Sequence, residues 1–245
     1  MSNFRYLYNN LIDAALTVST EDSVYVKENL YNQRIGKPFK FTADGGNIVI
    51  DLGSAQPVDA IAILAHNLTN SATITLEGNA TDSWGAPAKS ENITWATKNA
   101  YKIFTEVSFR YWRLVIADGT NPNNVKIGEL VICTGVELSS NYQFGAVDTP
   151  NHVVLTEKTE YGQSWNYYLT SSRVFELSFM AQPVTQDEIN ILFNAVKGSF
   201  SPFVFISHDD LCYYVRMGND LPQELQYSYA NISIKLTEEP EGKEI

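Results

Sequence analysis

From about residue 14 to residue 133, the sequence is a succession of short apolar segments separated by turn residues. No helical periodicity in this stretch extends beyond two turns. Alternating or continuous apolar segments occur at Ile48–Leu52, Ala60–Leu64 and Tyr111–Ala117. Gly, Asn, Asp and Pro around them supply turn geometry, as at Asp44-Gly45-Gly46 and Gly53-Ser54. This spacing favours an antiparallel sandwich or barrel, so we expect a mainly β fold.

A weakly periodic segment, Gly135–Pro150, separates this region from a second set of strand candidates. We therefore predict two domains, residues 1–137 and 138–245. At 245 residues the chain is long enough for both to bury a core of their own.

One helix is expected in the second domain, at about residues 185–197. Thr185 fits the N-cap and Glu188 completes a capping box. Lys197 and Gly198 are expected to end the helix, and its apolar stripe comprises Ile189, Leu192, Phe193 and Val196. A final strand follows, in which Ala230, Ile232, Ile234 and Leu236 share one face.

The formal charge of −11 argues against a nucleic-acid partner, because phosphate neutralisation requires clustered Lys and Arg. The N-terminus shows no signal-peptide pattern and no apolar run approaches bilayer length, so we expect no membrane insertion and synthesis in the cytosol. Cys133 and Cys212 lie in apolar surroundings and are expected to be buried, free thiols.

Catalytic signatures are absent from the sequence. The three histidines, His66, His152 and His208, lie in no recognisable catalytic or metal motif, so we expect no enzyme activity, no cofactor and no metal. His208-Asp209-Asp210 is interpreted as a hairpin turn rather than an acid–base site, and Asp44–Asn47 as a turn rather than a calcium loop.

Two tryptophans flank a polar stretch that resembles a loop. Trp84 and Trp95 could stack on a sugar ring or a partner surface, or could cover the edge of the sandwich. Trp112 alternates with its neighbours along a strand and is expected in the core.

Several segments of the first domain follow one another in a recognisable order: Glu28-Asn29-Leu30, Asn47–Gly53, Val58–Asn67, Thr75–Gly78, Tyr111–Ile116 and Ile127–Leu130. Together they resemble the discoidin family, whose fold is a galactose-binding-like jelly-roll β-sandwich. The resemblance implies a module that binds sugars, lipids or proteins through loops at one end of the sandwich.

By position, four residues fall in or near those loops: Arg34, His66, Asn67 and Trp84. We take them as candidate ligand residues. For His66 and Asn67 the favoured interpretation is structural, with both residues terminating a strand and satisfying its backbone groups.

The second domain resembles the β-sandwich or barrel with one helix found in bacteriophage distal-tail and minor tail proteins, the tail-hub type. The similarity rests on the predicted helix and on four strand segments: Arg173–Phe179, Pro202–Phe205, Tyr213–Met217 and Ile232–Pro240. It implies a ring around the tail axis in which neighbouring subunits cover open edge strands.

The main hypothesis is therefore a structural component of a phage tail tip or baseplate, assembled in the host cytoplasm and located in the virion tail. Its partners would be tail-tube, hub and tape-measure proteins and further copies of itself, as a trimer or hexamer, with avidity arising from a ring of weak sites. One alternative is a carbohydrate-binding module that recognises a host-surface glycan. Another is a cell-wall glycan hydrolase with two carboxylates brought together in space.

Overall fold

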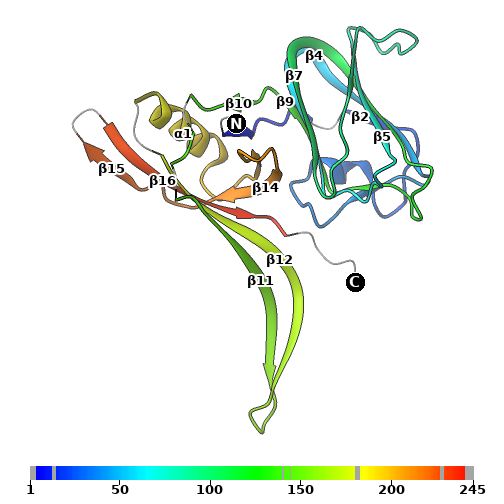
Figure 1. Ribbon diagram of the computed structural model, residues 1–245. Helices are drawn as coiled ribbons and strands as arrows, with labels where there is room; N and C mark the ends of the chain where they lie inside the picture. The colour runs from blue at the N-terminus through cyan, green and yellow to red at the C-terminus, as the bar shows by residue number, and fades with distance from the viewer. Residues whose placement is uncertain are drawn as a thin grey trace. The chain divides into compact units, whose positions relative to one another are not determined.

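The computed structural model describes residues 4–12, 15–139, 141–143, 145–179, 183–226 and 229–240. The chain divides into two compact units (Figure 1). The first comprises residues 5–136, and the second comprises Phe4 and the described residues from Glu137 onward. The domain boundary predicted after residue 137 stays a prediction, because compactness alone does not show independent folding.

The described chain is mainly β, with antiparallel sheets and one α-helix, as predicted. Short strands β1 (Arg5–Leu7) and β10 (Val136–Glu137) lie near the two ends of the first unit in sequence. Between them, the first unit contains β2 (Leu16–Val18), the 3₁₀ helix η1 (Lys27–Leu30), β3 (Phe39–Lys40), β4 (Gly45–Leu64), β5 (Thr73–Asn79), β6 (Lys89–Asn92), β7 (Ala100–Ala117), β8 (Lys126–Ile127) and β9 (Glu129–Cys133).

Two long strands organise the first unit. β4 pairs with β7 along most of its length, β2 pairs with the first part of β4, and β9 pairs with the last part. β5 joins the second half of β7 and carries β6 on its other side. Residues facing inward along β4 and β7, among them Ile50, Ile63, Trp112 and Leu114, are almost fully buried. The alternation in the sequence therefore forms one apolar core, and the expectation that Trp112 lies in it is confirmed.

Two turns predicted in this unit are not separate turns. Gly53-Ser54 lies inside the continuous strand β4, where the register with β7 shifts between Asp51 and Gln56 and Gly53 has φ of +72°. Residues 52–55 of β4 lie opposite Arg110 alone, so this is an enlarged β-bulge, which bends a strand without ending it. Likewise β4 begins at Gly45, so Asp44–Asn47 is mostly strand; the Asp44 carbonyl accepts the Asp118 N–H at 2.8 Å.

The second unit contains β11 (Val147–Lys158), β12 (Ser164–Phe179), α1 (Pro183–Val196), β13 (Phe203–Ile206), β14 (Cys212–Met217), β15 (Gln223–Gln226) and β16 (Tyr229–Glu238). Its strands follow the order β13-β14-β16-β12-β11, with β15 beside β16. Ile232, Ile234 and Leu236 of β16 are buried as predicted, while Ser233 and Lys235 are exposed; the side chain of Ala230 lies outside the described residues.

The predicted helix is confirmed as an element, but its start differs. α1 begins at Pro183, a residue suited to the first helical turn because its missing N–H needs no partner there. Thr185 is therefore inside the helix and not at its N-cap, and its side chain lies outside the described residues. The Glu188 carboxylate accepts the Ser139 N–H at 3.1 Å and the Ser139 hydroxyl at 3.2 Å, and the predicted capping box stays a prediction.

The end of α1 follows the prediction. Lys197 and Gly198 have φ of 55° and 63°, and the Gly198 N–H donates to the Phe193 carbonyl at 3.1 Å. Left-handed residues of this kind close helices. Ile189, Leu192 and Val196 are buried on the predicted stripe, and Phe193 is half-buried.

β11 and the first half of β12 extend beyond the rest of the second unit as a two-stranded ribbon (Figure 1). Every residue of β11 is exposed, as is β12 from Ser164 to Leu169. We call residues 147–171 the ribbon. Its exposed large apolar side chains are Val147, Val153, Val154, Leu155, Tyr161, Trp165, Tyr167, Tyr168 and Leu169. No helix among the described residues is long and apolar enough to cross a membrane.

Candidate binding sites

The structure brings three of the four predicted ligand residues to the same end of the first unit. His66 and Asn67 follow β4, and the Asn67 N–H donates to the Lys126 carbonyl beside β9. Arg34 is exposed and follows Gln33, whose N–H donates to the Glu129 carboxylate at the start of β9. Trp84 lies elsewhere, and the guanidinium of Arg113, a residue of β7, lies over its ring.

His66 and Asn67 make the strand-end contacts that the sequence favoured. The Asn67 amide donates to the Asn124 carbonyl at 3.0 Å, and its oxygen accepts the Lys126 N–H at 2.7 Å. The His66 Nδ1 accepts the Leu68 N–H at 3.2 Å. The imidazole is buried, and burial lowers the pKa of His66 to about 4, although the nearby Asp118 carboxylate acts in the opposite direction. A ligand role for His66 and Asn67 stays a prediction.

Trp84 is held in a defined position by neighbouring side chains. It lies in the loop after β5, is half-buried and is surrounded by the exposed residues Asp82, Ser83 and Gly85. Its Nε1 donates to Asp82 Oδ1 at 2.6 Å, and the Arg113 guanidinium lies over its ring at 4.7 Å. Two contacts therefore fix the ring before any ligand binds.

Trp95 has the other role that the sequence left open. Its Nε1 donates to the Leu68 carbonyl at 2.9 Å, and its ring packs against the core of the first unit while remaining half-buried. This packing favours the covering role over the stacking role.

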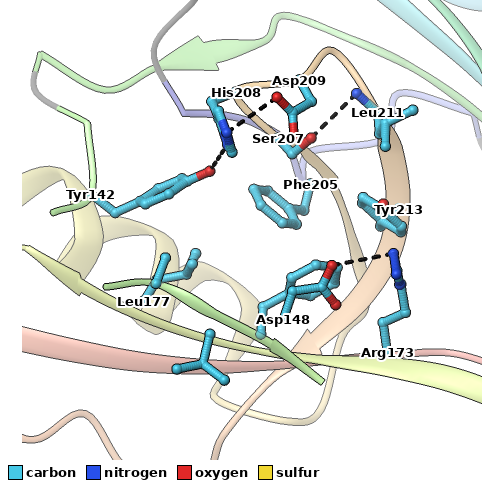
Figure 2. Close-up of a pocket in the computed structure, with 13 residues that line it drawn as sticks. Tyr142, Asp148, Arg173, Leu177, Phe205, Ser207, His208, Asp209, Leu211 and Tyr213 are labelled. Carbon is cyan, nitrogen blue, oxygen red and sulfur yellow. Dashed lines mark hydrogen bonds and ion pairs between the residues drawn. The ribbon is translucent and has the colours of Figure 1, made fainter. Parts of the chain in front are cut away.

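The second unit contains a cavity of about 210 Å³ that the sequence did not predict (Figure 2). Its walls come from the inner part of β12, from β13, β14 and the turn between them, and from the start of β11 with the chain that leads into it. The base of the cavity is aromatic. Phe175 lies 5.2 Å from Phe205 and 4.8 Å from Tyr213, measured between ring centroids.

One rim of the cavity is a chain of polar side chains. The Tyr142 hydroxyl contacts His208 Nδ1, and His208 Nε2 lies 3.2 Å from Asp209 Oδ1. A neutral imidazole satisfies both contacts, because the phenol can donate to Nδ1 while Nε2–H donates to the carboxylate. Burial raises the pKa of Tyr142, which keeps the phenol protonated and able to donate.

The second rim is an ion pair between neighbouring strands. Arg173 Nη1 of β12 lies 3.2 Å from Asp148 Oδ2 of β11. Both side chains are about two-fifths exposed, so the pair borders solvent as well as the cavity. In Figure 2 this pair and the His208–Asp209 pair lie on opposite sides of Phe205.

The sequence signal for the cavity is weak. Its polar residues are spread along the chain from Tyr142 to Asp209, and only His208-Asp209-Asp210 stands out among them. That segment does form the predicted turn: the Ser207 N–H donates to the Leu211 carbonyl at 2.9 Å, and Asp210 has φ of 58°. The same turn also supplies one rim of the cavity.

The remaining histidine, His152, and the two cysteines do not line the cavity. His152 lies on the ribbon against the ring of Tyr168. Cys133 and Cys212 are buried free thiols, as predicted, and burial raises both pKa values, that of Cys133 to about 12. Among the described residues, no group of three His, Cys, Asp or Glu side chains could hold a metal ion.

Comparison with known protein families gives no matching family model, and no curated protein matches the sequence. Solved structures with partial likeness include chitosan-binding module 1 of a chitosanase/glucanase from Paenibacillus sp. IK-5, with 18% identity, a TM-score of 0.41, and coverage of 51% of this chain and 99% of that one. Module 2 of that enzyme, in complex with chitotriose, has 14% identity and a TM-score of 0.41, with coverage of 50% of this chain and 98% of that one. The lectin domain of Lectinolysin, in complex with Lewis B antigen, has 10% identity and a TM-score of 0.42, with coverage of 51% of this chain and 94% of that one. Because these sequence identities and TM-scores are low, the architecture of the first unit is assigned from its strand pairing and not from these structures.

Proposed function

We propose that this chain is a glycan-binding protein without catalytic activity of its own, and that Trp84 forms the floor of its saccharide site. The observation that carries the proposal is the fixed indole of Trp84, which is held by Asp82 and Arg113 at a polar, solvent-exposed loop. The apolar face of a sugar ring packs on an aromatic side chain, and its hydroxyls find polar partners beside it.

The surroundings of Trp84 suit such a ligand. Arg113 is itself held by Glu77, whose Oε2 accepts from the Arg113 Nε at 2.7 Å, so the cation and the ring above it form one ordered group. Binding to groups that are already ordered costs less conformational entropy than ordering a mobile loop.

A glycan array followed by calorimetry tests the proposal. Wild-type protein should bind at least one oligosaccharide, and Trp84→Ala should weaken that binding by about tenfold or more, since aromatic hot spots are worth over 1 kcal/mol. Trp165→Ala is the matched control, because it removes an exposed tryptophan of the ribbon. Equal affinity in wild type and Trp84→Ala, or turnover of the glycan by the wild-type protein, would contradict the proposal.

The ribbon favours a second candidate function, assembly. In this role the chain is a structural component of a bacteriophage tail tip or baseplate, ring-forming through its second unit, with tail-tube, hub and tape-measure proteins as partners. The first unit then projects from the ring or braces against neighbouring proteins. Clustered exposed apolar side chains are typical of interaction sites.

The charge distribution is compatible with contact between copies. The chain carries a net charge of −11, yet residues 149–156 and 163–172 of the two ribbon strands contain no Asp, Glu, Lys or Arg. Two acidic chains therefore meet little like-charge repulsion there. Negative-stain microscopy of concentrated protein should reveal closed rings, and a strictly monomeric protein at all concentrations would eliminate this candidate.

A further inference from the structure

We propose that the cavity of the second unit is a ligand site in its own right, separate from Trp84, and that it accepts one uncharged saccharide ring. The assignment of a saccharide rests on the proposed function, whereas the location rests on the cavity alone. The cavity is built from residues of the second unit, so it shares no residue with the strand-end contacts of His66 and Asn67 in the first unit.

The size of the cavity sets the first limit on the ligand. Pockets for drug-sized molecules measure about 300–1,000 Å³. A cavity of about 210 Å³ lies below that range and suits a single ring rather than a nucleotide or an acyl chain. A longer glycan would place one of its rings in the cavity and leave the others outside.

The base of the cavity sets the second limit. Phe175 and Phe205 are nearly fully buried and Tyr213 is half-buried, and the three rings lie in mutual contact. The two phenylalanines hold the orientation of Tyr213, and Tyr213 is the ring of the base that keeps a partly accessible apolar surface for a ligand. The C–H face of a pyranose matches such a surface, while a fully polar ligand would lose hydration there without compensation.

The rims set the third limit. Asp148 accepts from Arg173 and Asp209 accepts from His208, and the side chains of these two carboxylates are 43% and 67% exposed. A carboxylate has about four lone-pair positions, so one partner leaves capacity for hydroxyl donors of a ligand. Arg173 supplies further N–H donors on one side. Hydroxyls around a ring that rests on the aromatic base can thus be bonded from both rims.

The same rims disfavour charged ligands. Two carboxylates bordering a small cavity repel phosphate and sulfate groups, and the Arg173 guanidinium at its rim is already paired with Asp148. A small primary ammonium ion would be attracted to the carboxylates and to an aromatic face, but it would leave most of a cavity of about 210 Å³ unfilled. A neutral polyhydroxylated ring uses the base and both rims.

The test uses the full-length chain and four proteins: wild type, Trp84→Ala, the cavity variant Arg173→Met/Asp209→Asn, and the control Arg110→Met/Asp51→Asn. The control alters a comparable part-exposed ion pair in the first unit, where Arg110 Nε lies 2.7 Å from Asp51 Oδ1. The probes are glucose, galactose and N-acetylglucosamine, with methylammonium and acetate as charged competitors. Amide chemical shifts and saturation-transfer NMR report binding.

If the inference is correct, at least one hexose shifts the amides of residues 207–211 and 173–177 in the wild type. In the cavity variant the dissociation constant for that hexose should rise about tenfold, the cost of losing charge-assisted hydrogen bonds. Neither Trp84→Ala nor the control should change it. Loss of binding in Trp84→Ala alone would overturn this inference and support the site in the first unit.

The wild-type spectrum tests the cavity site even if the cavity variant folds poorly. Hexose titration that leaves all amides of residues 173–177 and 207–211 unmoved would overturn the proposal, as would shifts with methylammonium or acetate alone. Conversely, cavity shifts together with unchanged glycan affinity in Trp84→Ala would preserve this site and refute the proposed role of Trp84.

Discussion

The buried carboxylate of Glu129 accepts the backbone N–H of Gln33, with 3.0 Å between the nitrogen and Oε2. Glu129 is 1% exposed at the start of β9, and Gln33 has a left-handed φ of 60°. Burial raises the pKa of Glu129 from its ordinary 4.5 to about 8, against the opposing effect of the Gln33 N–H. The first unit therefore retains a proton that the unfolded chain would release.

This difference predicts that stability falls as pH rises. The contribution of Glu129 is fully present below pH 4.5 and is lost as pH rises towards about 8, because between these values only the folded state binds the proton. The free energy of unfolding should decline by up to about 1.4 kcal/mol per pH unit over that window. Glu129→Gln keeps an acceptor for Gln33 and should remove the decline. Urea denaturation between pH 6.5, above the titration range of His66, and about pH 8 measures the decline, and parallel curves for both proteins would contradict the assignment.

His66 predicts the opposite dependence on the acidic side. Its folded pKa of about 4 lies below the ordinary 6.5, so its contribution is present above pH 6.5 and is lost as pH falls towards 4. His66→Asn removes the titrating ring, and the acid side of the stability curve should become flatter by roughly 1 kcal/mol per pH unit. His152→Asn, on the exposed ribbon, is the control. If both variants follow the wild-type curve below pH 6.5, burial of His66 is not the cause.

Much of the fold could be predicted because its strands have one buried face. In β16 and in the core parts of β4 and β7, apolar and polar residues alternate because successive side chains point to opposite faces of the sheet. The continuity of β4 was harder to predict. Gly53-Ser54 has the composition of a turn, and only the pairing of β4 with β7 shows that the strand continues through a bulge at this point.

The ribbon could not be predicted for a physical reason. Both of its faces are exposed, so Val153-Val154-Leu155 and Tyr167-Tyr168-Leu169 show no alternation to indicate strands. The cavity could not be predicted for a different reason. Arg173 and Asp148 are 25 positions apart and become neighbours only through the register of β11 against β12, which the sequence does not encode locally.

Asn67 offers a test that separates a structural role from a ligand role. Its amide bonds both the Asn124 carbonyl and the Lys126 N–H, so Asn67→Ala should lower the free energy of unfolding by about 1–3 kcal/mol. Asn123→Ala, at an exposed position of the same loop, should change it by less than about 0.5 kcal/mol. Thermal unfolding measures both. Unchanged stability in Asn67→Ala together with weakened glycan binding would instead favour the ligand role.

The ribbon predicts self-association that depends on its apolar side chains. Leu155 and Tyr167 are cross-strand partners, and Trp165 lies 6.1 Å from Tyr167 between ring centroids, so the three form one exposed cluster. Leu155→Ser/Trp165→Ser should raise the dissociation constant of any oligomer at least about tenfold, because exposed residues contribute little to folding and much to an interface core. Sedimentation velocity across a concentration series measures this. Val24→Ser removes an apolar side chain that is 67% exposed in the first unit and should leave association unchanged. Equal weakening by both variants would show that general surface hydrophobicity, and not the ribbon, drives assembly.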